Sequence, residues 1–286
     1  TGIDLIIASK TLKSWLALTM LVNTHLNIIG NENSMPLSTL LDWKSSNFRS
    51  PEELLQLSAY WAGPEWAVDG VWMPWEERAR QAVIVQVGEK LCKPVVVLDE
   101  TELQQAFEVF QHVKAVFDWL VKQGKLTIPQ NEEYRIGDMY LPSVTYILSQ
   151  VMAKPALMNW HYTKGIEAVT ELYARQQIHL LIPETTERIK QLAQEEGLSP
   201  TAIRDAKGSQ GSAIHKNILF FLEGKEVDTT QAPDWLSGAL SQVAGWTQRV
   251  KFAPVALERK VCHRDLGYAG RCDAVGWMEL KGNDSP

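Results

Sequence analysis

The fold predicted for this chain depends on the segment Leu40-Leu41-Asp42-Trp43-Lys44-Ser45-Ser46. It continues an apolar run that starts at Leu37 and is typical of a short β-strand. Since residues two apart share one face of a strand, Asp42 and Lys44 are expected to point the same way and Trp43 the other way. A carboxylate beside an amine at a strand end is half of a metal-assisted phosphodiester-cleaving site, so a second acid is expected on a neighbouring strand.

Five acid–x–lysine pairs occur in the sequence, and ordinary composition supplies roughly one or more per chain of this size. They are Asp42/Lys44, Asp205/Lys207, Glu223/Lys225, Glu258/Lys260 and Glu279/Lys281.

Asp273 is the candidate for the second acid, and Glu279 follows it on the same predicted strand. Two residues six apart on one strand lie roughly 20 Å apart, too far to bind one metal ion. The partner of Asp273 should therefore lie on an adjacent strand. Only the Asp42/Lys44 pair lies in an apolar strand followed by a polar helix start.

The composition is that of an ordinary soluble globular protein: 286 residues, of which 45% are hydrophobic and 22% charged. A net charge of -6 argues against a uniformly basic nucleic-acid-binding surface and permits a local basic groove. The three cysteines are widely spaced, which excludes a disulfide framework or a zinc or iron–sulfur set and favours a reducing compartment.

Residues 1–36 are predicted to be an N-terminal extension. An apolar patch from Trp15 to Val22 has Lys10, Lys13 and His25 close by, and a docking helix for a protein partner is favoured over a signal peptide. No apolar run is long enough to span a membrane, so no membrane association is expected.

About five strands are expected, with helices on both sides and not in strict alternation, which predicts an α+β or α/β layered fold. The predicted strands are 37–43, 81–87, 94–98, 257–262 and 270–280. Helices are predicted from Pro51 and at 102–122, 156–173 and 183–197, with another after 140–145. A loop containing Gly208, Gly211 and Ser212 is predicted to open the helix with His215.

Several short motifs together resemble the RecB-type nucleases of the PD-(D/E)XK superfamily, in particular the group of the mitochondrial genome maintenance exonuclease. Two of them resemble the late motifs of that family, namely Asp42-Trp43-Lys44-Ser45-Ser46 and Gln56-x-x-x-Tyr60. The others resemble the early motifs, namely 141–145, 160–165, Gly211-Ser212-Ala213-Ile214-His215, Glu258 and 267–273. The resemblance covers most of residues 37–280 and implies a restriction-endonuclease-like fold, a central mixed sheet flanked by helices.

The order of these motifs differs from the family, because the late motifs come first. Circular permutation explains the order: one nuclease domain spans 37–286, in which 37–122 is the usual C-terminal part, 123–133 a linker and 134–286 the usual N-terminal part. The new ends would open the hairpin between the Asp273 and Asp42 strands, and hairpin tips tolerate such cuts. Domain swapping with a neighbouring molecule is the alternative explanation.

The resemblance implies hydrolysis of DNA with Mg²⁺ or Mn²⁺, whose hard oxygen ligands are carboxylates. Asp273 and Asp42 would bind the metal, and Lys44 would stabilise the transition state or orient the water. His215 is implied as a further catalytic or metal-binding residue and Glu258 as a further ligand. Relatives often have Glu four residues after this histidine; here Leu219 takes that place, which indicates a smaller ligand set.

Substrate contacts are expected from Gln56, Tyr60, Ser45 and Arg271, although Gln56 and Tyr60 could instead brace the site. The predicted function is a deoxyribonuclease, favoured as an exonuclease on single-stranded ends, in a bacterial or phage-type cytoplasm or an organelle matrix. The alternatives are a non-catalytic DNA-binding or assembly module, and a structural subunit that docks through residues 1–29.

Overall fold

The computed structural model describes residues 36–45, 50–75, 78–152, 155–178, 186–227, 229 and 232–280. All helices and strands named below belong to the compact unit that starts at Leu37. The predicted N-terminal extension lies outside the described residues, apart from Pro36. Within the described part of the chain, no helix combines the length and the apolar character that crossing a membrane requires.

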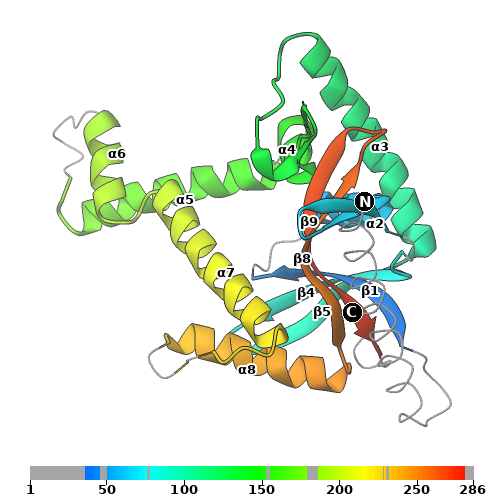
Figure 1. Cartoon of the computed structure of the whole chain (residues 1–286). Coiled ribbons are helices and arrows are strands. Elements are labelled where there is room, and N and C mark those ends of the chain that lie inside the picture. Colours follow the sequence, from blue (N-terminus) through cyan, green and yellow to red (C-terminus); the bar gives the residue numbers. More distant parts are fainter. Residues whose placement is uncertain are drawn as a thin grey trace. The chain divides into compact units, whose positions relative to one another are not determined.

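Seven strands form one mixed sheet in the order β3-β2-β8-β9-β1-β4-β5 (Figure 1). β1 is parallel to β4 and every other neighbouring pair is antiparallel. The strands are β1 (Leu37–Lys44), β2 (Glu65–Val68), β3 (Val71–Pro74), β4 (Gln81–Gly88), β5 (Leu91–Asp99), β8 (Ala253–His263) and β9 (Tyr268–Met278). A separate small hairpin consists of β6 (Arg135–Ile136) and β7 (Met139–Tyr140).

Helices flank both faces of this sheet, which confirms the mixed α/β class. One face packs against α2 (Pro51–Ala62), α3 (Glu100–Lys122) and α4 (Val144–Val151), and we call this layer the first core. The other face packs against α7 (Pro200–Leu222) and α8 (Asp234–Arg249), which form the second core. A third, smaller cluster joins α5 (Pro155–Ala174) to α6 (Thr186–Glu195), and a 3-10 turn, η1 (Glu132–Tyr134), precedes β6.

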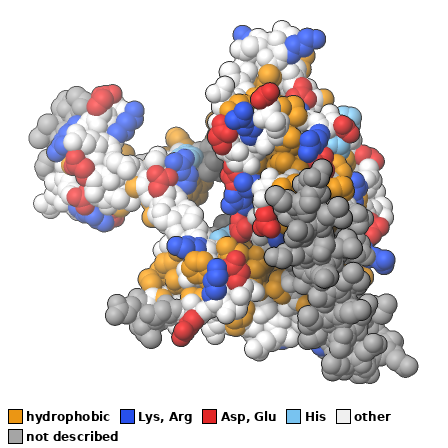
Figure 2. Space-filling model, in the orientation of Figure 1, with side chains coloured by type: hydrophobic (Ala, Val, Ile, Leu, Met, Phe, Trp, Pro, Cys, Tyr) orange, Lys and Arg blue, Asp and Glu red, His pale blue; other side chains and the backbone are white. Residues whose placement is uncertain are grey.

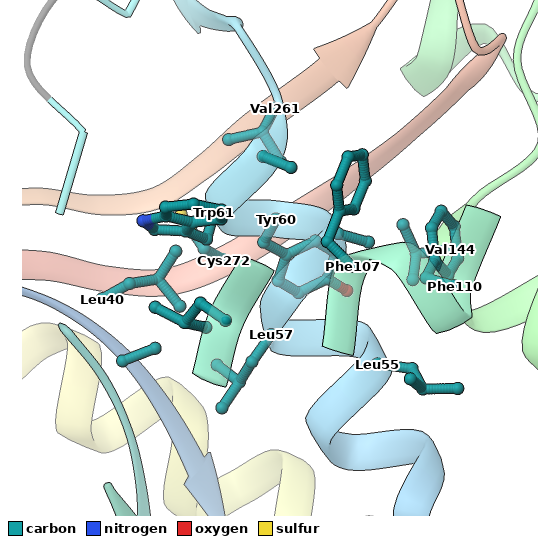
Figure 3. Close-up of a cluster of buried hydrophobic side chains, with 14 of the residues drawn as sticks. Leu40, Leu55, Leu57, Tyr60, Trp61, Phe107, Phe110, Val144, Val261 and Cys272 are labelled. Carbon is teal, nitrogen blue, oxygen red and sulfur yellow. The ribbon is translucent and has the colours of Figure 1, made fainter. Parts of the chain in front are cut away.

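The alternation predicted for β1 is confirmed. Leu40 lies in the first core beside Leu57 and Tyr60 of α2, as Figure 3 shows. Leu41 and Trp43 lie in the second core, where the Trp43 ring meets the edge of Trp246 with 5.5 Å between ring centroids. Asp42 and Lys44 therefore belong to the face of Leu40, as expected from the period of two.

The strands of Asp42 and Asp273 are neighbours, as the sequence predicts. β1 pairs antiparallel with β9 from Leu37↔Met278 to Leu41↔Ala274. Two segments more than 200 residues apart thus form the centre of the sheet, and Leu37 lies directly beside Met278.

The loop predicted at Gly208, Gly211 and Ser212 is wrong, because α7 continues through all three residues. The helix begins instead at Ser199, whose side chain accepts a hydrogen bond from the Ala202 amide, with Pro200 in the first turn. Ser followed by Pro is a strong helix start, and an interior glycine costs only about 1 kcal/mol. His215 consequently lies in the middle of a long helix and does not follow its N-terminus.

The expected five strands are too few, since the sheet also contains β2 and β3. Their turn is the pair Asp69-Gly70, whose φ angles of 50° and 80° suit a two-residue hairpin turn. The Asp-Gly pair is present in the sequence and could have predicted this hairpin. Helix α8 also has no counterpart among the predicted elements, although Trp246 from it is fully buried in the second core.

Candidate active site

The site forms where β1 and β9 separate. Their pairing ends at Leu41↔Ala274, whereas β1 continues beside β4 as far as Lys44↔Gln86. Beyond this point the Trp43 amide donates a hydrogen bond to Asp273 Oδ2 at 2.7 Å. A side-chain carboxylate has taken the position of a backbone acceptor, so Asp273 lies in the fork between the two strands.

Both strands of the β8–β9 hairpin are irregular at the level of this fork. On β9, Cys272 and Val275 are three residues apart yet both pack in the first core, so the alternation is interrupted between them. Opposite, Glu258 lies between the pairs Leu257↔Ala274 and Arg259↔Cys272 and has a left-handed φ of 49°. The irregularity places Asp273 and Glu258 together at the wall of one cleft.

Asp42 and Lys44 share one face of β1, as their spacing predicts, and they form an ion pair with 2.8 Å between Lys44 Nζ and Asp42 Oδ2. The Asp42 side chain is buried, and its Oδ2 has no hydrogen bond of regular geometry among the described residues. Burial disfavours the Lys44 ammonium, but the attraction of Asp42 and then of Asp273 outweighs this effect and raises the pKa of Lys44. The lysine is therefore a fixed positive charge beside two carboxylates.

The pKa of Asp273 is strongly shifted by its surroundings. Burial, and then the negative charge of Asp42, raise its pKa well above the ordinary value for aspartate, while the Trp43 amide acts in the opposite direction. Two largely buried carboxylates that repel one another are stabilised by a nearby cation, and Lys44 already pairs with Asp42 Oδ2. The raised pKa of Asp273 beside Asp42 fits a divalent metal ion bound between the two carboxylates.

His215 reaches this pair from α7, with its Nδ1 3.6 Å from Asp273 Oδ2. Burial lowers its pKa, against the attraction of Asp42, which favours the neutral imidazole with a free nitrogen lone pair. Among the described residues, no three His, Cys, Asp or Glu side chains already form a metal cluster. The arrangement that fits a metal is thus the carboxylate pair, with His215 and Glu258 at the edge.

Asp273, Lys44, His215 and Glu258 line a cleft of about 790 Å³ that α7 closes on one side. Asp42 is buried beside them and is not among the lining residues. Its cationic side chains are Lys44, Lys207, Lys216 and Arg271. Figure 2 shows Lys and Arg side chains interspersed with acidic and apolar ones on the face in view, so positive charge is not spread evenly over it. A protein with a net charge of -6 thus gathers four cations around one cleft.

Ser45 and Gly211 explain why α7 can approach the end of β1. A Cβ atom at Gly211 would lie 2.8 Å from Ser45 Oγ, so a larger side chain would require a shift. Both residues line the cleft together with Gly208 and Ser212. The glycines that suggested a loop therefore lower the side-chain bulk of a helix face beside the site.

Gln56 and Tyr60 lie outside the set of residues that line the cleft. Gln56 Nε2 donates to the Tyr60 hydroxyl at 2.8 Å, and the Tyr60 ring is buried. A Cβ atom at Gly270 would lie 2.2 Å from Tyr60 Cε1, so this ring packs directly on the β9 backbone. Their position is that of a brace that holds α2 against β9, close to the Asp273 fork.

Sequence reasoning missed Glu53 and two lysines of α7. Glu53, in the first turn of α2, is half-buried; burial raises its pKa and the nearby Lys44 lowers it. Lys207 and Lys216 flank the small residues of α7 and line the cleft. Lys207 and Lys216 lie on either side of the Gly-Ser motif in the sequence, so they could have been predicted to lie near the site. The position of Glu53 could not, because it depends on how α2 packs against the sheet.

Glu279, from the acid–x–lysine pair that was rejected as a metal ligand, has a different partner. Glu279 is buried and forms an ion pair with Lys251 at 2.9 Å, and it is not among the residues that line the cleft. Glu223 and Lys225 form a pair of their own at 2.5 Å, also outside the cleft.

Comparison of the chain with protein-family models, with curated proteins and with solved structures gives no match.

Proposed function

We propose that this protein is a metal-dependent nuclease that hydrolyses the phosphodiester bonds of DNA, built on a restriction-endonuclease-like fold with circularly permuted motifs. The observation that supports it best is the Asp273 carboxylate in the β1–β9 fork, beside the Asp42–Lys44 ion pair and inside a cationic cleft. Paired buried carboxylates, a lysine and surrounding cations are the groups that this reaction requires.

Asp42 and Asp273 would hold Mg²⁺ or Mn²⁺, with Glu258 as a further oxygen ligand and His215 as a nitrogen ligand that suits Mn²⁺. The bound metal supplies an activated water and neutralises charge on the phosphate. Lys44, kept protonated by its two acids, would stabilise the negative charge that develops in the transition state.

A nucleic acid is the substrate class that the cleft favours, because Lys207, Lys216 and Arg271 can contact phosphates without regard to sequence. The resemblance selects DNA among the nucleic acids. The resemblance adds a preference for single-stranded ends and an exonuclease mode. Ser45 lines the cleft at the end of β1 and would contact the same backbone.

The test is cleavage of end-labelled single- and double-stranded DNA with Mg²⁺, Mn²⁺ or EDTA. Asp42→Asn and Asp273→Asn should each reduce cleavage about 100-fold or more. Glu223→Gln is the matched control, since it alters an acid–x–lysine pair outside the cleft and should leave the rate unchanged. Equal activity in all four proteins would contradict the proposal.

A non-catalytic DNA-binding module is the second candidate. Two observations favour it: the described residues contain no ready three-ligand cluster, and Leu219, not a glutamate, lines the cleft one helical turn after His215. Binding of the same DNA with no cleavage in either metal would establish this candidate and overturn the nuclease.

A further inference from the structure

We propose that Lys260 and Arg271 form a phosphate-binding site at the edge of the cleft, and that Glu133 occupies it until a DNA phosphate takes its place. We call these two cations the rim site. The proposal deepens the proposed function and rests on DNA being the ligand of the cleft.

The first argument is the register of the β8–β9 hairpin. Lys260 and Arg271 are directly opposite partners on these antiparallel strands. Like charges at opposite positions of a sheet destabilise it unless an anion lies between them. The sequence of this hairpin therefore creates a place for a negative charge.

The second argument is the group that fills this place. Glu133 Oε1 lies 3.8 Å from Lys260 Nζ and forms an ion pair with Arg271 Nη2. Glu133 belongs to η1, in the segment that joins α3 to α4, and not to the sheet itself. Carboxylate and phosphate bind a guanidinium through the same forked geometry, so Glu133 is an internal stand-in for a phosphate.

The third argument is access. The side chains of Lys260, Arg271 and Glu133 are 34%, 40% and 30% exposed. Solvent can therefore reach the ion pairs, and such pairs are weak enough to exchange. A DNA backbone can offer the same negative charge without unfolding any strand.

The fourth argument is continuity with the candidate active site. Arg271 and Glu258 both line the cleft, and Arg271 Nη1 lies 3.4 Å from Glu258 Oε2. Asp273 follows Arg271 by two residues on β9. A strand bound at Asp273 can therefore reach the rim site, while Glu258 still holds the guanidinium after Glu133 leaves.

The test compares Glu133→Gln with the matched control Glu132→Gln. Glu132 is the neighbouring acid, but it bonds Arg135 and Tyr140 instead of the rim site. The measurement is binding of a short fluorescent single-stranded oligonucleotide in EDTA, so that no cleavage occurs. Glu133→Gln should bind about three- to tenfold more tightly. Its logarithmic salt dependence should be steeper by about 0.7 for each additional phosphate contact. Glu132→Gln should match the wild type.

A second variant keeps the test decisive if Glu133→Gln does not fold. Lys260→Gln leaves the Glu133–Arg271 pair in place and should bind the oligonucleotide more weakly, with a shallower salt dependence. Unchanged affinity and salt dependence in folded Glu133→Gln, or in Lys260→Gln, would overturn the rim site.

The binding result separates this proposal from the nuclease. Tighter binding by Glu133→Gln without cleavage by any variant supports the rim site and overturns the nuclease. Metal-dependent cleavage with no change in binding supports the nuclease and overturns the rim site.

Discussion

Asp273 has two roles at once: it accepts the Trp43 amide as part of the sheet, and it faces Asp42 and His215 as an acid of the cleft. Its environment favours the protonated form, since burial and the charge of Asp42 both oppose ionisation. A divalent cation that binds between the two acids has to displace this proton, and it then offsets the repulsion between the two carboxylates.

The raised pKa of Asp273 makes stability depend on pH. In the folded chain its proton is held more tightly than in the unfolded chain, where the pKa is about 3.9. The stability that this preference contributes is complete below that value and is lost as the pH rises through the folded pKa. In EDTA, Asp273→Asn should therefore gain in Tm over the wild type as the pH increases from about 4 to 8.

Mg²⁺ supplies the control for this prediction. The metal should raise the Tm of the wild type at neutral pH and leave Asp273→Asn nearly unaffected, which would narrow the gap between them. A Tm difference that stays constant across the pH range, measured by thermal melting in EDTA, would show that the acid is not buried as described.

Among the secondary-structure elements, the β8–β9 hairpin forms part of the cleft wall, at the irregularity around Glu258 and Asp273. Glu258 keeps a left-handed backbone in the middle of a strand pair, a conformation that costs a non-glycine residue about 1–3 kcal/mol. Strain of this kind is often found at functional sites, and here it coincides with a side chain that lines the cleft.

Comparing Glu258→Gly with Glu258→Ala separates backbone strain from chemistry. Both remove the carboxylate and should reduce cleavage to the same extent. Glycine accepts the positive φ, so Glu258→Gly should be more stable to urea than Glu258→Ala by about 1 kcal/mol. At exposed Lys93 on β5, which has no positive φ, alanine should be at least as stable as glycine.

Some parts of the fold could be predicted from the sequence alone. The period of two in β1 predicted the faces of Asp42 and Trp43, and the limit on metal–ligand distance predicted that Asp273 lies on an adjacent strand. Local signals that were present, namely Ser199-Pro200 and Asp69-Gly70, define a helix start and a hairpin that the prediction missed. The fork itself could not be predicted, because it depends on where the pairing of β1 and β9 ends, which no local pattern encodes.

At the scale of the whole molecule, segments from opposite ends of the described chain share the centre of the sheet. Leu37 lies beside Met278, so the two strands can be joined by a short hairpin loop. The connection between α3 and α4 lies outside the seven-stranded sheet. Joining β9 to β1 and cutting the connection between α3 and α4 would give the motif order that is usual in the nuclease family this sequence resembles.

A rearranged chain that runs from residue 128 to 280, through a short loop, and then from 37 to 127 should fold with the same sheet. The expected result is an unchanged circular dichroism spectrum, a cooperative thermal transition and retained DNA cleavage, since every strand neighbour is preserved. A control joined in the same way but reopened within β4, between Val83 and Ile84, should not fold. Failure of the first chain as well would contradict circular permutation as the origin of the motif order.

The hydrogen bond from the Trp43 amide to Asp273 has a consequence for how the cleft can be observed. A ligand that draws this carboxylate away leaves the Trp43 amide without its acceptor. At this level β1 is still paired with β4 but no longer with β9, so no backbone carbonyl of β9 replaces the carboxylate. Protection of that single amide against deuterium exchange thus reports on the occupancy of the cleft. The occupancy of the cleft would then be read at one backbone nitrogen of the sheet.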